Sequence, residues 1–386
     1  MASPVKLISV RKISPPPSPE TEMIWLFHAY RNLSESAQVV EWIPYPAEIS
    51  SSLENAVRYG LEETFINDTH RIDFIELLEV RMEDPTCCRP IRRCSLTLFR
   101  EIERMTKLDP PRCERLSFRL NTNLQCSTSV DTAYHGSQFV RDWLLKFTNG
   151  KLSVKFNDIF PALINGLKDE GRQEPKNIVN DIVRILNSAK DESCKMNEKK
   201  RMKKLQDCCI KLYTKQCYVF RIVNTALRDD DRTKLDTLGP YCYLVYNCIG
   251  RHIHDQHLLE LLHRNKSHSM TVYRGDSAPR KTIEEYRQAA SRKEKYFKWL
   301  SFVSTSADRI VAEHFALNVL YVIEVERYLS MDQYTDLDTN TYFESEQEIL
   351  LKPGTRFRVT KVELDSISGR HLVHIKIIPS YVSHLR

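Results

Sequence analysis

The chain has 386 residues, of which 41% are hydrophobic and 28% are charged. This composition excludes a disordered chain, because enough apolar residues are present to bury a core, and the length favours two domains over one. The 57 basic and 51 acidic residues give a net charge of +6 but are intermingled, so we expect no nucleic-acid partner.

The sequence predicts an intracellular protein, cytoplasmic or nuclear. The first twenty residues lack the apolar core of a signal peptide, and no stretch approaches the roughly 20 apolar residues that span a bilayer, so we expect no membrane partner. Eleven cysteines show no CxxC spacing, and the histidines between 252 and 268 have no cysteine or carboxylate partners at ligand spacing. We therefore expect reduced thiols and no metal.

The N-terminal third predicts an arm followed by a small domain. Residues 1–20 are rich in proline and serine and predict a flexible, extended arm. A helix is predicted over Ile49–Gly60, with Ser50, Ser51 or Ser52 as its cap and Gly60 as its stop. Residues Ile72–Val80 partly alternate and predict a strand. These elements indicate a small α+β domain.

The rest of the chain changes from helices to strands. Residues 109–175 are interpreted as a connector with helices, and apolar spacing of three and four predicts several helices up to Cys248, the longest near Lys199–Leu227. Two later helices are predicted at Thr282–Ala290 and Ala307–Asn318. Strands are predicted at Met270–Tyr273, Trp299–Thr305, Leu320–Val325, Glu348–Leu351, Arg356–Leu364 and His371–Ile378. The fold class is therefore α+β.

Three short motifs lie at the predicted strand ends: Tyr273-Arg-Gly275, Phe302-Val-Ser-Thr-Ser306 and the run from Phe343 to Leu351, which contains Glu-Gln-Glu. In this order they resemble the Arg, Ser-Thr-Ser and Glu-x-Glu series of the arginine-type (R-S-ExE) mono-ADP-ribosyltransferases. The helical segments 212–228 and 237–247 are also similar to that family. The resemblance implies a helical half followed by two packed β-sheets around an NAD cleft.

The resemblance implies NAD as a substrate, no metal, and a role for each motif. Glu348 would stabilise the oxocarbenium-like ribose as nicotinamide leaves. Arg274 would pair with the pyrophosphate, and Gly275 would allow close backbone approach. Ser304 would orient Glu348. Residues that would shape the nicotinamide pocket are Thr305 and Ser306, with Phe315 in its wall.

The same resemblance implies where the acceptor binds. Glu346 lies two residues before Glu348, so strand spacing predicts that both side chains point to the same side. In the family this position orients an acceptor arginine. Tyr342 and Phe343, in the loop before it, would contact the acceptor protein.

The N-terminal domain resembles a WWE domain, a module that binds ADP-ribose or poly(ADP-ribose). Its eponymous residues would be Trp25, Trp42 and Glu54. Trp42, Tyr45 and Arg89 would bind ADP-ribose, with Tyr45 against the adenine and Arg89 against a phosphate. Glu79 stands where such readers tend to have glutamine, and a carboxylate facing that pocket would repel phosphate.

The sequence therefore predicts a transferase that cleaves NAD and modifies an arginine of an acceptor protein. Its expected parts are an arm (1–20), a WWE-like domain (21–108), a connector (109–175) and a catalytic domain (176–386). Two alternatives stay open: an NAD glycohydrolase, in which water replaces the acceptor, and a catalytically silent scaffold that binds NAD or ADP-ribose. Polymer formation is disfavoured because that group has His in place of Arg274 and Tyr in place of the serine.

Overall fold

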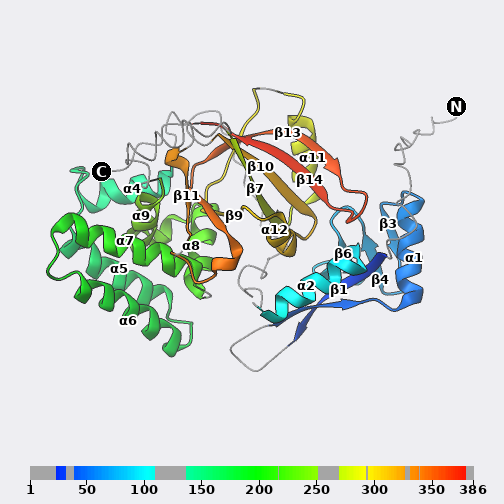
Figure 1. Cartoon of the computed structure of the whole chain (residues 1–386), viewed down its shortest axis with the longest axis horizontal. Helices are drawn as coiled ribbons and strands as arrows, with labels where there is room; N and C mark the ends of the chain where they lie inside the picture. Colours follow the sequence, from blue (N-terminus) through cyan, green and yellow to red (C-terminus); the bar gives the residue numbers. More distant parts are fainter. Residues whose placement is uncertain are drawn as a thin grey trace. The chain divides into compact units, whose positions relative to one another are not determined.

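The computed structural model describes residues 23–31, 39–108, 136–215, 217–250, 269–292, 294–326, 331–338 and 340–379 (Figure 1). It divides into two compact units: Met1–Pro111 with Glu363–His371, and Arg112–Val362 with Leu372–Arg386. The predicted arm, residues 109–135 of the predicted connector and the histidines between 252 and 268 lie outside the described residues.

The first unit is built on a six-stranded sheet with the order β2-β1-β6-β5-β4-β3. Its strands are β1 (Met23–Arg31), β2 (Val39–Pro44), β3 (Glu63–Phe65), β4 (His70–Asp73), β5 (Leu78–Arg81) and β6 (Cys88–Ser95). Two helices accompany it, α1 (Ala47–Arg58) and α2 (Leu96–Leu108). Leu53 and Ala56 of α1 pack into a core with the buried Trp25 and Ile91 of the sheet. This part is a small α+β region, as predicted.

Helix α1 begins earlier than predicted, at Ala47 after Pro46, so the expected serine cap is wrong. The Ser50 hydroxyl instead accepts a hydrogen bond from the Trp25 main-chain N–H at 3.2 Å. The predicted stop is confirmed. Gly60 has a φ of +70° and donates its N–H to the Val57 carbonyl at 2.9 Å.

The single strand predicted over Ile72–Val80 is also wrong, because the chain turns within it to form the antiparallel pair β4 and β5. The Asp73 carboxylate accepts hydrogen bonds from the N–H groups of Ile75 and Glu76 at 2.9 and 2.8 Å. Leu77 then adopts a positive φ of 52°. The local side-chain bonds and this left-handed residue stop the strand, and periodicity does not show either.

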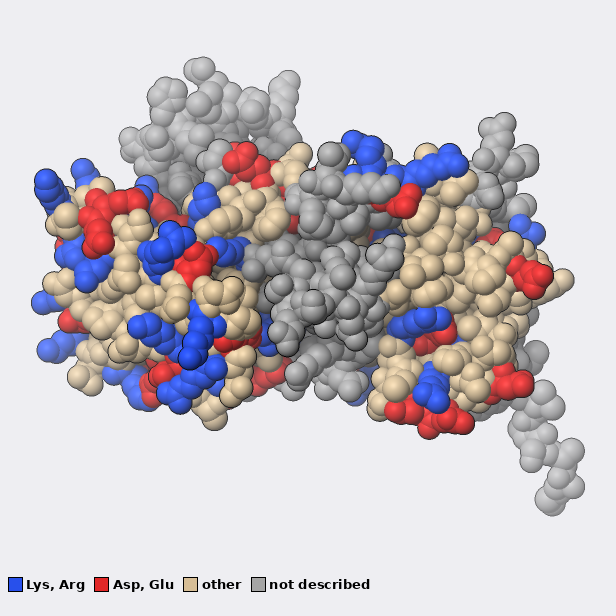
Figure 2. Space-filling view, turned by 90° about the horizontal axis from the view of Figure 1, so that it is seen from below, with Lys and Arg blue, Asp and Glu red and all other residues tan. Residues whose placement is uncertain are grey.

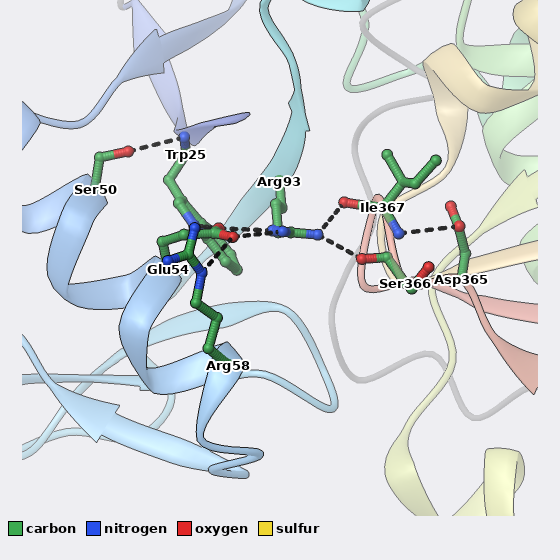
Figure 3. Close-up of polar contacts among 8 residues, drawn as sticks. All are labelled: Trp25, Ser50, Glu54, Arg58, Arg93, Asp365, Ser366 and Ile367. Carbon is green, nitrogen blue, oxygen red and sulfur yellow. Dashed lines mark hydrogen bonds and ion pairs between the residues drawn. The ribbon is translucent and has the colours of Figure 1, made fainter. Parts of the chain in front are cut away.

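The segment Glu363–His371 belongs to the first unit, and Arg93 binds it there (Figure 3). Arg93 donates to the carbonyls of Ser366 and Ile367 at 2.6 and 2.5 Å and forms a two-point ion pair with Glu54 at 2.8 and 2.6 Å. Glu54 also accepts from the Trp25 indole at 3.4 Å. Although burial opposes it, the Arg93 guanidinium holds the pKa of Glu54 below its usual range.

The second unit begins with a helical half, in green in Figure 1. Its helices are α4 (Gln138–Phe147), α5 (Phe156–Glu170), α6 (Lys176–Glu192), α7 (Glu198–Thr214), α8 (Tyr218–Arg228) and α9 (Leu235–Cys248). Residues 238–248 of α9 are all buried, so this helix forms the centre of the helical core. A Cβ on Gly239 would lie 2.1 Å from Cδ1 of Trp143, which shows how closely α4 approaches α9.

The long helix predicted over Lys199–Leu227 is two helices, α7 and α8. The break comes at Lys215, whose backbone is extended. At the end of α7, the Thr214 hydroxyl donates to the Lys211 carbonyl at 2.8 Å and accepts from the Tyr342 N–H at 2.9 Å. The end of α7 is therefore bonded to the predicted acceptor loop.

The remaining strands have the order β11-β12-β9-β7-β10-β14-β13-β8. They are β7 (Ser269–Asp276), β8 (Phe297–Lys298), β9 (Val303–Ser306), β10 (Val319–Glu326), β11 (Tyr334–Asp336), β12 (Glu348–Leu351), β13 (Arg356–Leu364) and β14 (His371–Ile377). The helices among them are α11 (Arg280–Ala289) and α12 (Arg309–Phe315). The pair Tyr273–Ser306 joins the group β11-β12-β9 to the group that starts with β7.

The predicted fold class is confirmed: a helical half followed by two groups of strands, preceded by a small α+β region. None of the described helices combines the length and apolarity needed to cross a membrane. On the face drawn in Figure 2, basic and acidic side chains are interspersed.

Candidate functional site

The guanidinium of Arg274, on β7, is held by two neighbours. Nη1 donates to the Ser304 carbonyl on β9 at 2.9 Å. Nε and Nη2 lie 3.0 and 2.9 Å from Oδ2 of Asp276, two residues along the same strand. Because side chains at i and i+2 of a strand share a face, Asp276 is within reach of Arg274 without any turn of the chain. The Arg274 side chain keeps 26% of its surface exposed.

A buried serine and carboxylate lie on the next two strands. The Ser304 hydroxyl donates to Oε1 of Glu348 at 2.5 Å, and Glu348 is only 2% exposed. The antiparallel register of β12 and β9 pairs Glu348 with Ser306 and Leu350 with Ser304, so the serine–glutamate bond is a diagonal across the two strands. Ser304 therefore connects two side chains: its main-chain carbonyl accepts from the Arg274 guanidinium, and its hydroxyl donates to the Glu348 carboxylate.

Thr305 and Ser306 bond to the N-terminal end of β12 and to the turn that precedes it. The Thr305 hydroxyl donates to the Ile349 carbonyl, and the Ser306 hydroxyl donates to the Glu346 carbonyl, both at 2.7 Å. Both hydroxyls thus bond to protein carbonyls and fix the strand that carries Glu348. Their predicted contact with nicotinamide stays a prediction.

Glu346 does not share a strand with Glu348, so the strand-spacing argument was wrong. It lies in a short 3-10 turn, Glu344–Glu346, and β12 begins only at Glu348. Between them Gln347 has a left-handed backbone, with φ of 45°. Glu346 is nevertheless buried, with 8% exposure, and its carbonyl is bound by Ser306. The turn and the serine, rather than strand alternation, position this carboxylate.

Gly275 and Phe315 meet where β7 contacts α12. A Cβ on Gly275 would lie 2.2 Å from both the Ala312 carbonyl oxygen and the Ala316 nitrogen. The missing side chain thus allows α12 to pack on β7, beside Arg274. The Phe315 ring is half-buried and lies edge-on to His314, with ring centroids 5.6 Å apart. Contact of either residue with NAD stays a prediction.

The predicted acceptor loop presents an exposed aromatic ring. Tyr342 is 42% exposed, and the ammonium groups of Lys211 and Lys215 each lie 5.4 Å from its ring centroid. Phe343 donates its N–H to the Thr341 hydroxyl at 3.1 Å. The sequence did not indicate the two lysines, because Lys211 lies in the last turn of α7 and Lys215 directly follows that helix, more than a hundred residues before Tyr342.

The sequence reasoning also missed Asp276. The signal was present, since an acidic residue two positions after Arg274 on a predicted strand shares its face. The strand was predicted to end at Tyr273, whereas β7 continues to Asp276 and pairs with Val319 of β10 there.

In the first unit, Tyr45 and Arg89, two of the three residues predicted to bind ADP-ribose, both bond to Glu79. Glu79 accepts a hydrogen bond from the Tyr45 hydroxyl, and Arg89 donates to it from Nε at 2.8 Å and from Nη2 at 3.0 Å. The Arg89 guanidinium also lies 3.9 Å from the ring centroid of Phe27. The carboxylate therefore neutralises the cation that was predicted to bind phosphate.

Trp42 is not part of that cluster. Its ring lies 4.2 Å below the Arg92 guanidinium and 5.2 Å from the ring of His28. His28 directly follows Phe27 on β1, and successive strand side chains point to opposite faces. The three residues predicted to bind one ligand thus lie on two faces of the sheet.

The described residues contain no group of three or more His, Cys, Asp or Glu side chains that could hold a metal. Nine cysteines in the described part of the chain are free thiols. Burial raises the pKa of several of them, Cys208 to about 11, which disfavours the reactive thiolate.

A sequence model of the NAD:arginine ADP-ribosyltransferase family matches residues 172–374. This match includes all three motifs and the strands from β7 to the first half of β14. No curated protein matches the chain.

Three solved structures with similarity to this chain are bacterial. The effector XopAI of Xanthomonas axonopodis pv. citri is 14% identical, with 62% of this chain and 96% of that chain covered and a TM-score of 0.36. The ADP-ribosyltransferase toxin Plx2a of Paenibacillus larvae is 17% identical, with 51% and 96% covered and a TM-score of 0.32. The ADP-ribosyltransferase HopU1 of Pseudomonas syringae pv. Tomato DC3000 is 17% identical, with 64% and 100% covered and a TM-score of 0.36.

Proposed function

Because this chain belongs to the NAD:arginine ADP-ribosyltransferase family, we propose that it transfers ADP-ribose from NAD to an arginine side chain of an acceptor protein. NAD is the substrate of the family. The observation that supports this proposal best is the 2.5 Å bond from the Ser304 hydroxyl to Glu348, beside a guanidinium bonded to the same serine's carbonyl.

The carboxylate stabilises the charge that develops when NAD is cleaved. As the bond from ribose C1′ to the nicotinamide nitrogen breaks, the electron pair leaves with nicotinamide and positive charge spreads over the ribose. Glu348 is 2% exposed, so water screens its charge little and its attraction for that cation is strong. Ser304 fixes the carboxylate before the reaction, which avoids a cost of reorienting it.

Arg274 suits the diphosphate of NAD. A guanidinium has five N–H groups, and the contacts to Asp276 and Ser304 use those on Nε, Nη2 and Nη1 once each. Those contacts leave two N–H groups, one on each terminal nitrogen. Two donors on the terminal nitrogens of one guanidinium can bind phosphate oxygens at two points.

Glu346 is proposed to orient the acceptor arginine. A new bond forms from an acceptor guanidinium nitrogen to C1′, and that nitrogen loses a proton to the solvent. The buried carboxylate of Glu346 follows an exposed loop containing Tyr342, so the acceptor is proposed to contact the loop. If water attacks C1′ instead, the enzyme is an NAD glycohydrolase.

Replacement of Glu346 by Gln tests this assignment. We expect transfer to free arginine or an arginine-containing peptide to fall while nicotinamide release from NAD persists. Loss of both together would place Glu346 in the cleavage step instead. If the wild-type protein releases nicotinamide at the same rate with and without a guanidine acceptor, its activity is that of an NAD glycohydrolase.

We also propose that the protein is intracellular, cytoplasmic or nuclear, which the free thiols favour. For the first unit we propose recognition of ADP-ribose or its polymer through Tyr45 and Arg89. The aromatic and cationic pair supports ADP-ribose recognition, and the pairing of Glu79 with Arg89 opposes it. Calorimetry of the full chain with ADP-ribose tests it, and no heat at millimolar ligand would reject it. The domain bounds of 21–108 and 176–386 are part of the same proposal.

A further inference from the structure

We propose that Asp276 is a positioning residue for NAD binding: its carboxylate fixes the guanidinium of Arg274 in the orientation that receives the diphosphate. This inference rests on the proposed function. Neither the three motifs nor the family match assigns a role to Asp276.

Asp276 is itself held rigidly. Only 6% of its surface is exposed. Oδ1 accepts the N–H of Ser277 at 2.9 Å, and its main-chain carbonyl accepts the N–H of Leu317 at 3.1 Å. Since Oδ1 is bound by the main chain, Oδ2 has a fixed position on the strand. A carboxylate that cannot rotate freely is a suitable anchor for a long side chain.

The anchor and the Ser304 carbonyl together determine the plane of the guanidinium. Oδ2 of Asp276 contacts Nε and Nη2, and the Ser304 carbonyl contacts Nη1, so all three nitrogens are engaged. Without Asp276, only the hydrogen bond from Nη1 to the Ser304 carbonyl would remain among these contacts, and the Arg274 guanidinium could rotate about that bond. The Ser304 bond also places Arg274 beside the serine that bonds to Glu348.

An opposing effect must be weighed. The Asp276 carboxylate is negative and would repel a diphosphate if it faced the ligand, so its removal would also increase the net positive charge of the site. Asp276 contacts only Nε and Nη2 of Arg274, and its other oxygen is bound by the Ser277 N–H, so each terminal nitrogen of Arg274 keeps an N–H group for the diphosphate. Glu79 differs because it binds both Tyr45 and Arg89, the two side chains proposed to bind ADP-ribose, so we expect the repulsion at Asp276 to be the smaller of the two. Ordering a long side chain, by contrast, has a recurring cost on binding, which a preformed orientation avoids.

The test compares full-length wild-type protein with Asp276→Asn, which removes the charge but can still accept the Ser277 N–H. We expect the KM for NAD in nicotinamide release to rise about tenfold, with a smaller change in kcat. The increase in melting temperature caused by NAD should shrink in parallel. This second readout reports binding and does not depend on turnover.

Arg274→Lys provides a double-mutant cycle. In the Arg274→Lys background, Asp276→Asn should change the KM little, because the guanidinium that Asp276 positions is already absent. Glu324→Gln on β10, which removes a carboxylate from its ion pair with Lys376 on β14, is the matched control and should leave the KM unchanged.

Several outcomes would overturn the inference. An unchanged KM in Asp276→Asn, or tighter NAD binding, would mean that the carboxylate does not position Arg274 or competes with the diphosphate. Additive effects in the cycle would also contradict it. If Asp276→Asn does not fold, Asp276→Glu keeps the charge but shifts it by one methylene, and a wild-type KM in that variant would refute the proposal. If the wild-type protein binds NAD without cleaving it, the proposed function fails, whereas the NAD-dependent melting shifts still decide the role of Asp276.

Discussion

Ser304→Ala isolates the one hydrogen bond that connects the serine to the buried carboxylate. The variant removes the 2.5 Å bond to Glu348 but keeps the main-chain carbonyl that binds Arg274. Hydrogen bonds to charged groups contribute about 1.5–3 kcal/mol, and water cannot easily replace the hydroxyl beside a carboxylate that is 2% exposed. If the bond acts on the transition state, kcat/KM should fall about 10- to 150-fold.

The assay is nicotinamide release from NAD across a range of NAD concentrations, with the melting temperature measured alongside. Thr360→Val is the matched control, because it removes an exposed hydroxyl on β13 that donates to the His374 carbonyl on β14 at 3.1 Å. The control should retain wild-type kcat/KM. A Ser304→Ala variant that stays folded and within threefold of wild-type kcat/KM would mean that this hydrogen bond does not act on the transition state.

Three further predictions concern binding and stability. Glu79→Gln should raise the affinity of the full chain for ADP-ribose about tenfold in calorimetry, because Arg89 loses its carboxylate partner; an unchanged affinity would mean that the cluster is structural. Burial, together with the nearby Arg92 charge, lowers the pKa of His28 from 6.5 to about 4. Between these two pH values the unfolded chain binds more protons at His28 than the folded chain does, so the free energy of unfolding should fall by about 3 kcal/mol as the pH is lowered from 6.5 to 4. Denaturation of His28→Gln should lack that part of the pH dependence, and an identical profile would contradict the assignment. Gly239→Ala would place a Cβ 2.1 Å from Trp143, so denaturant unfolding should show a loss of about 1–3 kcal/mol or more, and unchanged stability would contradict the described packing.

Regular elements with strong patterns could be predicted from the sequence. The predicted strands Glu348–Leu351 and Arg356–Leu364 have the same bounds as β12 and β13. Both strands pack hydrophobic side chains into the core, and the spacing of hydrophobic residues in a sequence indicates this kind of burial. Three of the predicted site residues, Arg274, Ser304 and Glu348, lie on β7, β9 and β12 and are connected by hydrogen bonds to Ser304.

Irregular features could not be predicted in the same way. Leu77 and Gln347 adopt positive φ without being glycine, and each ends or precedes a strand at a point where the sequence looks continuous. The break between α7 and α8 follows Thr214, whose hydroxyl bonds to a loop more than a hundred residues later. Such contacts depend on tertiary structure, so local patterns do not contain them.

The pairing of Glu79 with Arg89 shows a second limit. The sequence indicated a carboxylate near the predicted phosphate site, but not whether it would face the arginine. The cross-strand register of β5 and β6 places the two residues directly opposite each other. Only that register turns the expected repulsion into an ion pair.

The central claim is that Glu348 carries NAD cleavage, and Glu348→Gln tests it most directly because the amide keeps the shape and removes the charge. Nicotinamide release by wild type and variant should be measured with and without an arginine acceptor. We expect release by the wild type, ADP-ribosylated acceptor as a product, and a loss of at least about 100-fold in the variant. Equal release by the two proteins, or none by either, would contradict it.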